Sequence, residues 1–101
     1  MARVCIIVDF RIKPGSWAAF DAHIRAHAAA TLAEEPGCTA FDVLQPLAED
    51  GTPDHGRIML VEIYADEAAF DIHRHGPRMP GVGAASAPLL DGRTLTRCLM
   101  D

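Results

Sequence analysis

The segment Arg3–Ile12 is the feature that most constrains the fold, because its side chains alternate in character along its whole length. A period of two places successive side chains on opposite faces of a β-strand. One predicted face is wholly apolar and consists of Val4, Ile6, Val8, Phe10 and Ile12. The other carries Cys5, Ile7, Asp9 and Arg11. We therefore predict a strand with one face in the core and a second face that is also partly apolar.

A helix is predicted directly after this strand. Pro14 and Gly15 predict a turn, and Ser16 is a candidate helix cap. Apolar side chains then recur every three or four residues, at Trp17, Phe20, Ile24, Ala28 and Leu32. The helix is expected to end near Glu35, because Pro36 cannot continue it.

The rest of the chain alternates between strand and helix patterns. Strands are predicted over 38–45 and 58–64, with a polar loop between them at 46–57. Asp66 is a natural cap for a second helix that runs to about residue 75. A loose or broken helix is expected over 80–90, followed by a turn at Asp91-Gly92 and a last strand over 93–100.

The resulting order, βαββαβ, predicts one α+β domain over residues 1–101 with a ferredoxin-like fold. Its four strands form an antiparallel sheet with the first and third strands in the centre, and the helices cover one sheet face. The uncovered face carries Cys5, Ile7, Asp9 and Arg11, so much of it is apolar. A second copy of the chain is the simplest cover, and we expect a homodimer that encloses a cavity between sheet and helices.

Composition narrows the class of partner. The chain has 9 Lys and Arg against 14 Asp and Glu, a formal net charge of −5, which argues against nucleic acid and anionic membranes as partners. The apolar run at 4–8 is followed by Asp9 and Arg11, so it predicts neither a signal peptide nor a membrane span, and we expect a cytoplasmic protein. The 3 cysteines are far apart and suggest neither a disulfide framework nor a thiolate zinc site.

The second helix suggests a site for acid–base chemistry. Phe70 and His73 lie three residues apart and share a helix face, which predicts a pocket wall with one titratable group. His23 and His27 are four apart on the first helix, but no third metal ligand accompanies them, and we expect no metal.

Four motifs resemble those of the antibiotic biosynthesis monooxygenase superfamily of dimeric α/β barrels. They are Glu35-Pro36-Gly37-Cys38, the segment 41–45, Glu62-x-Tyr64, and the stretch from Asp66 through Phe70 and His73 to Pro77. The chain is most similar to the quinol monooxygenase and autoinducer-2-processing branches. The resemblance implies a homodimer with one pocket per subunit and oxygenation without flavin, haem or metal. In such enzymes the deprotonated substrate itself supplies the electrons that reduce dioxygen.

This resemblance implies a monooxygenase for a small quinol-like or phenolic substrate, with His73 as the base. His27 falls where related proteins carry a polar pocket residue, and it is the second catalytic candidate. Arg78 stands where the family often has another histidine, and because it cannot act as a base we expect it to hold an anion. The candidate substrate-binding residues are Tyr64, Glu62, Arg78, Phe41, Phe70, Arg11 and Asp9.

Alternatives remain open at this point. Glu62 and Tyr64 share one strand face and need partners if buried, so Arg11 and Asp9 on the neighbouring strand can also form a purely structural network with them. The same proton-transfer groups suit an isomerase of a phosphorylated, autoinducer-2-like ketone, and haem degradation is a further family activity. A non-catalytic dimer that binds a small molecule is the alternative outside enzymes.

Overall fold

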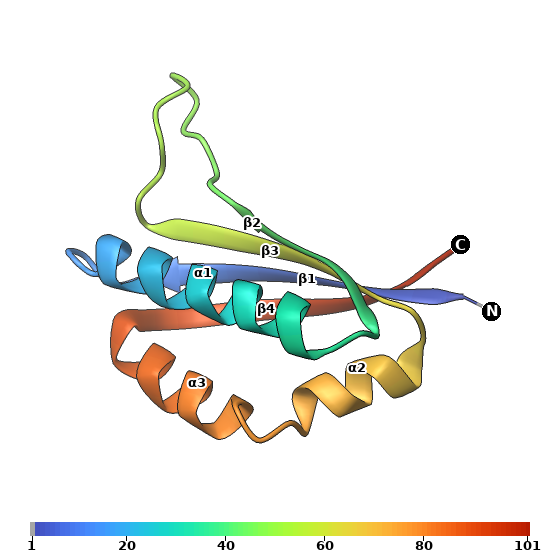
Figure 1. Cartoon of the computed structure of the whole chain (residues 1–101). Coiled ribbons are helices and arrows are strands. Elements are labelled where there is room, and N and C mark those ends of the chain that lie inside the picture. Colours follow the sequence, from blue (N-terminus) through green and yellow to red (C-terminus); the bar gives the residue numbers. More distant parts are fainter. Residues whose placement is uncertain (1) are drawn as a thin grey trace.

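A four-stranded antiparallel sheet forms the frame of the structure, a computed structural model that describes residues 2–101 (Figure 1). The strands are β1 (Arg3–Ile12), β2 (Cys38–Leu44), β3 (Arg57–Tyr64) and β4 (Leu90–Met100), in the spatial order β2-β3-β1-β4. Strands β1 and β3 are therefore central, as predicted, and the ferredoxin-like βαββαβ arrangement is confirmed.

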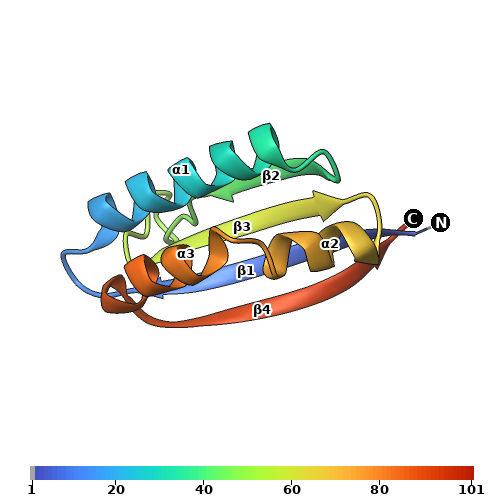
Figure 2. The ribbon, with the colours of Figure 1, turned by 60° about the horizontal axis from the view of Figure 1, so that its bottom comes forward.

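The helices α1 (Trp17–Glu34), α2 (Glu67–Arg74) and α3 (Met79–Ser86) lie on one face of this sheet (Figure 2). Helix α1 runs over β2, and α3 and α2 follow each other over the other half of the sheet. None of the helices among residues 2–101 combines the length and the apolar character needed to cross a membrane.

The alternation in β1 is confirmed by burial. Val4, Ile6, Val8, Phe10 and Ile12 all belong to the core between sheet and helices. Strand β3 follows the same rule, because Ile58, Leu60, Glu62 and Tyr64 are buried while the residues between them are half-buried. The inner face of β3 thus carries one carboxylate, Glu62, among the apolar and aromatic side chains of Ile58, Leu60 and Tyr64.

Helix α1 departs from its predicted stripe at one position. Leu32 is 46% exposed, whereas Thr31 is completely buried. The Thr31 hydroxyl donates a hydrogen bond to the carbonyl of His27 at 2.8 Å, so this polar side chain is satisfied inside its own helix. Ser16 precedes the helix as expected but makes no side-chain capping hydrogen bond.

The C-terminal part is more regular than predicted. Residues 79–86 form an α-helix despite two glycines, and a 3₁₀ turn at Ala87–Leu89 leads directly into β4. The predicted turn at Asp91-Gly92 is wrong, because β1 pairs with this segment: Ile12 faces Leu90 and Arg11 faces Gly92, with an irregularity in register between them. Pairing with a long central strand overrides the local turn preference of Asp-Gly.

Within residues 2–101, no helix lies over the outer face of the sheet (Figure 2). This face includes Ile7, Val61 and Ile63, which are only half-buried. Asp9 and Arg11 also point to this face, because successive side chains of β1 alternate between the two faces of the sheet. Glu62 and Tyr64 are paired with Ile6 and Val4 of β1 and therefore point to the opposite, inner face.

Candidate active site

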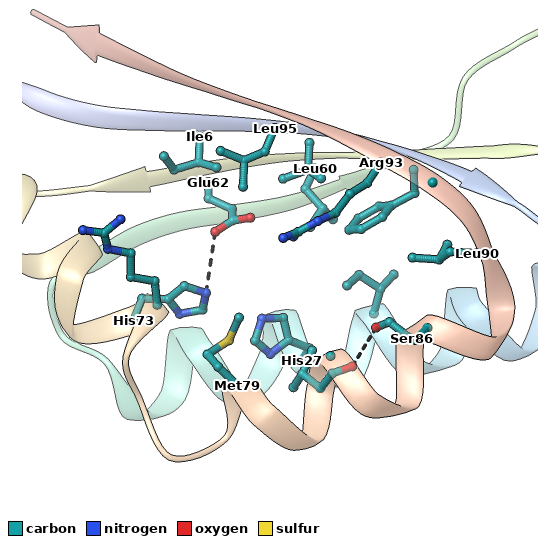
Figure 3. A pocket seen from close by; sticks show the side chains of 18 of the residues that line it. Ile6, His27, Leu60, Glu62, His73, Met79, Ser86, Leu90, Arg93 and Leu95 are labelled. Carbon is teal, nitrogen blue, oxygen red and sulfur yellow. Dashed lines mark hydrogen bonds and ion pairs between the residues drawn. The ribbon is translucent and has the colours of Figure 1, made fainter.

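A cavity of about 660 Å³ lies between the inner face of the sheet and the helices. Its walls are mostly apolar, with side chains from β1, β3, β4 and all three helices (Figure 3). Glu62, His73 and His27 contribute polar groups to this lining, and so does Arg93 from β4. A largely apolar space with a few converging polar groups is typical of a small-molecule site.

Helix α2 places His73 at this cavity. The Asp66 side chain accepts a hydrogen bond from the Ala69 backbone N–H at 2.8 Å, so Asp66 caps the helix as the sequence predicts. Gly37 allows the helix to approach, because a Cβ at this position would lie 2.6 Å from the Cβ of Ala69. His73 is only 4% exposed, and Phe70, one turn earlier, lines the same cavity.

The two nitrogens of His73 face two different carboxylates. Nδ1 lies 3.0 Å from Oε1 of Glu35, the residue that ends α1, and Nε2 lies 3.9 Å from Oε1 of Glu62 (Figure 3). An ionised carboxylate only accepts hydrogen bonds, so Nδ1 carries the proton and donates to Glu35. Nε2 then keeps its lone pair on the Glu62 side of the ring. Burial lowers the pKa of His73, although Glu35 opposes this change, so the neutral imidazole is favoured.

Glu62 is the unusual carboxylate of the site. Burial raises its pKa from the ordinary value of 4.5 to about 7, against the opposing effect of a hydrogen bond from Tyr64. The Tyr64 hydroxyl donates to Glu62 Oε1 at 2.6 Å. Burial, together with the neighbouring Glu62, raises the pKa of Tyr64, so this phenol stays protonated and remains a donor. Tyr64 is fully buried and does not line the cavity, so it contacts Glu62 and not the cavity space.

His27 has the opposite arrangement of ring protons. Its Nδ1 accepts a hydrogen bond from the guanidinium of Arg78 at 3.1 Å, so Nε2 carries the proton. Burial, with the nearby His73 and Arg78, lowers the pKa of His27 to about 4. His27 is therefore a neutral hydrogen-bond donor near neutral pH, and of the two histidines only His73 has a lone pair available to take a proton.

Arg78 differs from its expected role, because it does not line this cavity. Its guanidinium donates to Glu35 Oε2 at 2.6 Å and lies 2.9 Å from Glu34 Oε2. It borders a smaller hollow of about 340 Å³ between α1 and α3. Arg78 thus holds Glu35 and His27 in position, since its donors are used by the protein itself.

Asp9 and Arg11 are also outside the cavity, and the prediction that they accompany Glu62 and Tyr64 is wrong. Asp9 forms a two-point ion pair with Arg57, with an Nη2–Oδ2 distance of 2.7 Å, on the outer sheet face. Arg11 is exposed. Phe41 does not line the cavity either, but its ring packs edge-on against His27 at 5.4 Å between centroids.

His23 and His27 do not converge on a common point. His23 Nε2 lies 2.9 Å from the Ser86 hydroxyl, whereas His27 faces Arg78. Among residues 2–101, no group of three or more His, Cys, Asp or Glu side chains could hold a metal ion.

Two residues that complete the site, Glu35 and Arg93, are not among those that the sequence predicts for it, although Glu35 belongs to one of the motifs that resemble the family. Glu35 marks the end of α1, but its contact with His73 joins residues 38 positions apart. Arg93 begins the predicted last strand, and its place on the inner face follows from its pairing with Phe10 of β1. Only the alternation of Arg93 with Leu95 indicates that the two share a strand face.

The sequence profile of the antibiotic biosynthesis monooxygenase family matches residues 3–80, which include His27, Glu62 and His73. The chain belongs to this family. The resemblance to the antibiotic biosynthesis monooxygenase superfamily that the sequence motifs predict is therefore confirmed at the level of the family.

Solved structures of other proteins share the fold of this chain. A protein from Caulobacter crescentus, proposed to be an antibiotic biosynthesis monooxygenase, has 21% identity and a TM-score of 0.86 over 96% of this chain and 88% of its own. The protein Rv0793 from Mycobacterium tuberculosis has 28% identity and a TM-score of 0.78 over 95% of this chain and 92% of its own. PA3566 from Pseudomonas aeruginosa has 20% identity and a TM-score of 0.85 over 100% of this chain and 96% of its own. A comparison of the sequence with curated proteins found no match.

Proposed function

We propose that this protein is a cofactor-independent monooxygenase that deprotonates a small quinol-like or phenolic substrate and lets it react with dioxygen. One observation carries the proposal: His73 is buried at the cavity, with Nδ1 held by Glu35 and the lone pair of Nε2 on the side of Glu62. A general base needs a free lone pair, a fixed orientation and a nearby group that stabilises the proton it takes up.

In the proposed reaction, His73 Nε2 takes the proton of a phenolic hydroxyl. The resulting phenolate is electron-rich, and the Nε2–H of His27 is a hydrogen-bond donor for its oxygen. Glu35 and an ionised Glu62 stabilise the imidazolium that forms.

The oxygenation step follows from the electron-rich ring. A ring carbon ortho or para to the phenolate oxygen gives two electrons to dioxygen and bonds to it, and the imidazolium returns its proton to form a hydroperoxide. Loss of the ring hydrogen as a proton and of hydroxide from the peroxide yields water and a quinone. One oxygen atom enters the product and the other leaves as water, so no external reductant is needed.

We further propose that the active form is a homodimer. The outer face of the sheet carries the half-buried apolar side chains of Ile7, Val61 and Ile63 beside the Asp9–Arg57 ion pair, and no helix among residues 2–101 covers it (Figure 2). A second copy packed on this face would bury it and stiffen the sheet that carries Glu62.

Oxygen uptake tests the proposed activity. The purified protein, treated with a chelator, is given a panel of quinols and phenols, and His73→Ala is assayed alongside it. We expect uptake by the parent protein and a loss of about two to four orders of magnitude in kcat/KM for His73→Ala. His75→Ala is the matched control, because His75 ends the same helix but is exposed, and it should retain activity.

Two results would contradict the proposal. Absence of uptake with every compound would favour an isomerase, which moves a proton without consuming oxygen, or a protein that only binds its ligand. Equal uptake by the parent protein and His73→Ala would remove His73 from the reaction.

A further inference from the structure

Arg93 is an exposed cationic side chain that lines the cavity. It projects from the inner face of β4, where it pairs in register with Phe10, and extends into the cavity toward Glu62 (Figure 3). No ion pair or hydrogen bond joins its side chain to another of the residues 2–101. Arg93 is solvent-exposed, so its guanidinium needs no partner within the chain and is accessible to a ligand, and its charge is close enough to Glu62 to lower the pKa of that carboxyl group.

The other arginines that line the cavity are already paired. Arg74 binds Asp71 at 2.8 Å, and Arg97 binds Glu67 at 3.1 Å. Both guanidinium groups lie over the ring of Phe70, at 5.6 and 5.3 Å from its centroid. Arg93 is therefore the cavity-lining arginine, among the described residues, whose donors remain available to a ligand.

The surroundings of Arg93 indicate the kind of anion that fits. A planar guanidinium matches a carboxylate with two parallel hydrogen bonds. The same cavity also has Asp91 and Glu62 in its lining, so a group with a single negative charge suits one cation better than a phosphate dianion does. The walls between Arg93 and His73 include Leu60, Leu95 and Met79 and suit an aromatic body.

We infer that the cavity binds an aromatic hydroxy acid, whose carboxylate pairs with Arg93 while its hydroxyl faces His73. This inference rests on the proposed function for the role of the hydroxyl and adds the substrate class to it. Arg93 lies in β4, beyond residues 3–80, the part of the chain that the family profile matches.

A pair of probes that differ by one carboxylate tests the inference. Binding of 5-hydroxy-1-naphthoate, whose hydroxyl and carboxylate lie at opposite ends of the ring system, and of 1-naphthol is measured by calorimetry at pH 7 under nitrogen, so that no oxygenation takes place. We expect the parent protein to bind the carboxylate at least about tenfold more tightly than 1-naphthol, as is usual for a charge-assisted, two-point contact. Arg93→Gln should bring the two affinities to within about twofold and leave that of 1-naphthol nearly unchanged.

Two variants separate the contact from the charge. Arg93→Lys should keep part of the preference, because it retains a charge but not the two-point geometry. Arg25→Gln removes the same charge from the exposed surface of α1, away from the cavity, and should keep the full preference.

The outcomes are distinct from those of the oxygen assay. Equal binding of the two probes by the parent protein, no binding of the carboxylate, or a preference that survives Arg93→Gln would overturn the inference. Tighter binding of 1-naphthyl phosphate than of the carboxylate would overturn the choice of anion. A preference lost in Arg93→Gln, together with no oxygen uptake by the parent protein, would retain the anion site and reject the monooxygenase.

Discussion

Glu62 and Asp9 are carboxylates on the two central strands of the same sheet, yet they lie on opposite faces and in opposite surroundings. Asp9 is on the outer face, where Arg57 binds both of its oxygens and its side chain is 24% exposed. Glu62 is on the inner face, 5% exposed, and its hydrogen-bond partner is the neutral Tyr64.

The difference shows how one residue type serves two purposes. The charge of Asp9 is balanced by a cation and by solvent, so the pair contributes to surface structure. The charge of Glu62 is neither well solvated nor directly paired, which is why burial raises its pKa to about 7. A carboxylate poised near neutral pH beside the lone pair of His73 is suited to proton transfer.

The largest expected effect is on activity. Glu62→Gln keeps the shape of the side chain and an acceptor for Tyr64 but cannot ionise, so the imidazolium of His73 loses a stabilising charge. We expect kcat/KM for oxygen uptake to fall by about 100-fold. The rise in activity through about pH 7 that follows ionisation of Glu62 should also disappear from the pH profile.

Asp9→Asn is the matched variant on the other face. It neutralises one carboxylate and keeps a hydrogen-bond acceptor for Arg57, so activity should stay within about threefold of the parent protein. An equal loss of activity in both variants, with the parent pH profile retained in Glu62→Gln, would contradict the distinction between the two faces.

A smaller effect is expected on stability and its pH dependence. The folded-state pKa of Glu62 is raised above its ordinary value of 4.5, so folding favours the protonated form. This contribution to stability is fully present below about pH 4.5 and is lost as the pH rises through about 7. Glu62→Gln has no such loss, so its free energy of unfolding relative to the parent protein should rise by about 3 kcal/mol from acidic to slightly alkaline pH.

Urea unfolding of both proteins at a series of pH values measures this difference. Asp9→Asn, at pH 7, should lose less than about 1 kcal/mol, because a half-exposed ion pair contributes little. A relative stability of Glu62→Gln that is independent of pH would show that Glu62 ionises like an exposed carboxylate.

The fold was predictable from local patterns. The alternation in β1, the Asp66 cap and the pairing of Phe70 with His73 on one helix face are all encoded within a few neighbouring residues. The βαββαβ order follows from these elements together with the crossover rule. Where local preference competed with pairing, as at Asp91-Gly92, the sheet prevailed.

The site was predictable only in part. His73, His27, Glu62 and Phe70 line the cavity as expected, because helix and strand periodicity determines the face on which each lies. The contact of Glu35 with His73 and the position of Arg78 behind His27 depend on how α1 packs beside α2, which no local pattern specifies. Asp9 lies away from the site because the strict alternation of β1 directs its side chain to the outer face, where Arg57 binds it.

The central claim is that His73 presents a lone pair at Nε2 while His27 presents a proton there. A long-range ¹H–¹⁵N NMR spectrum of the imidazole rings at pH 7 reports the protonation of each ring nitrogen directly. The account predicts two neutral rings with opposite tautomers, protonated at Nδ1 in His73 and at Nε2 in His27. A spectrum in which His73 is a fully protonated imidazolium, or carries its single proton on Nε2, would contradict the account.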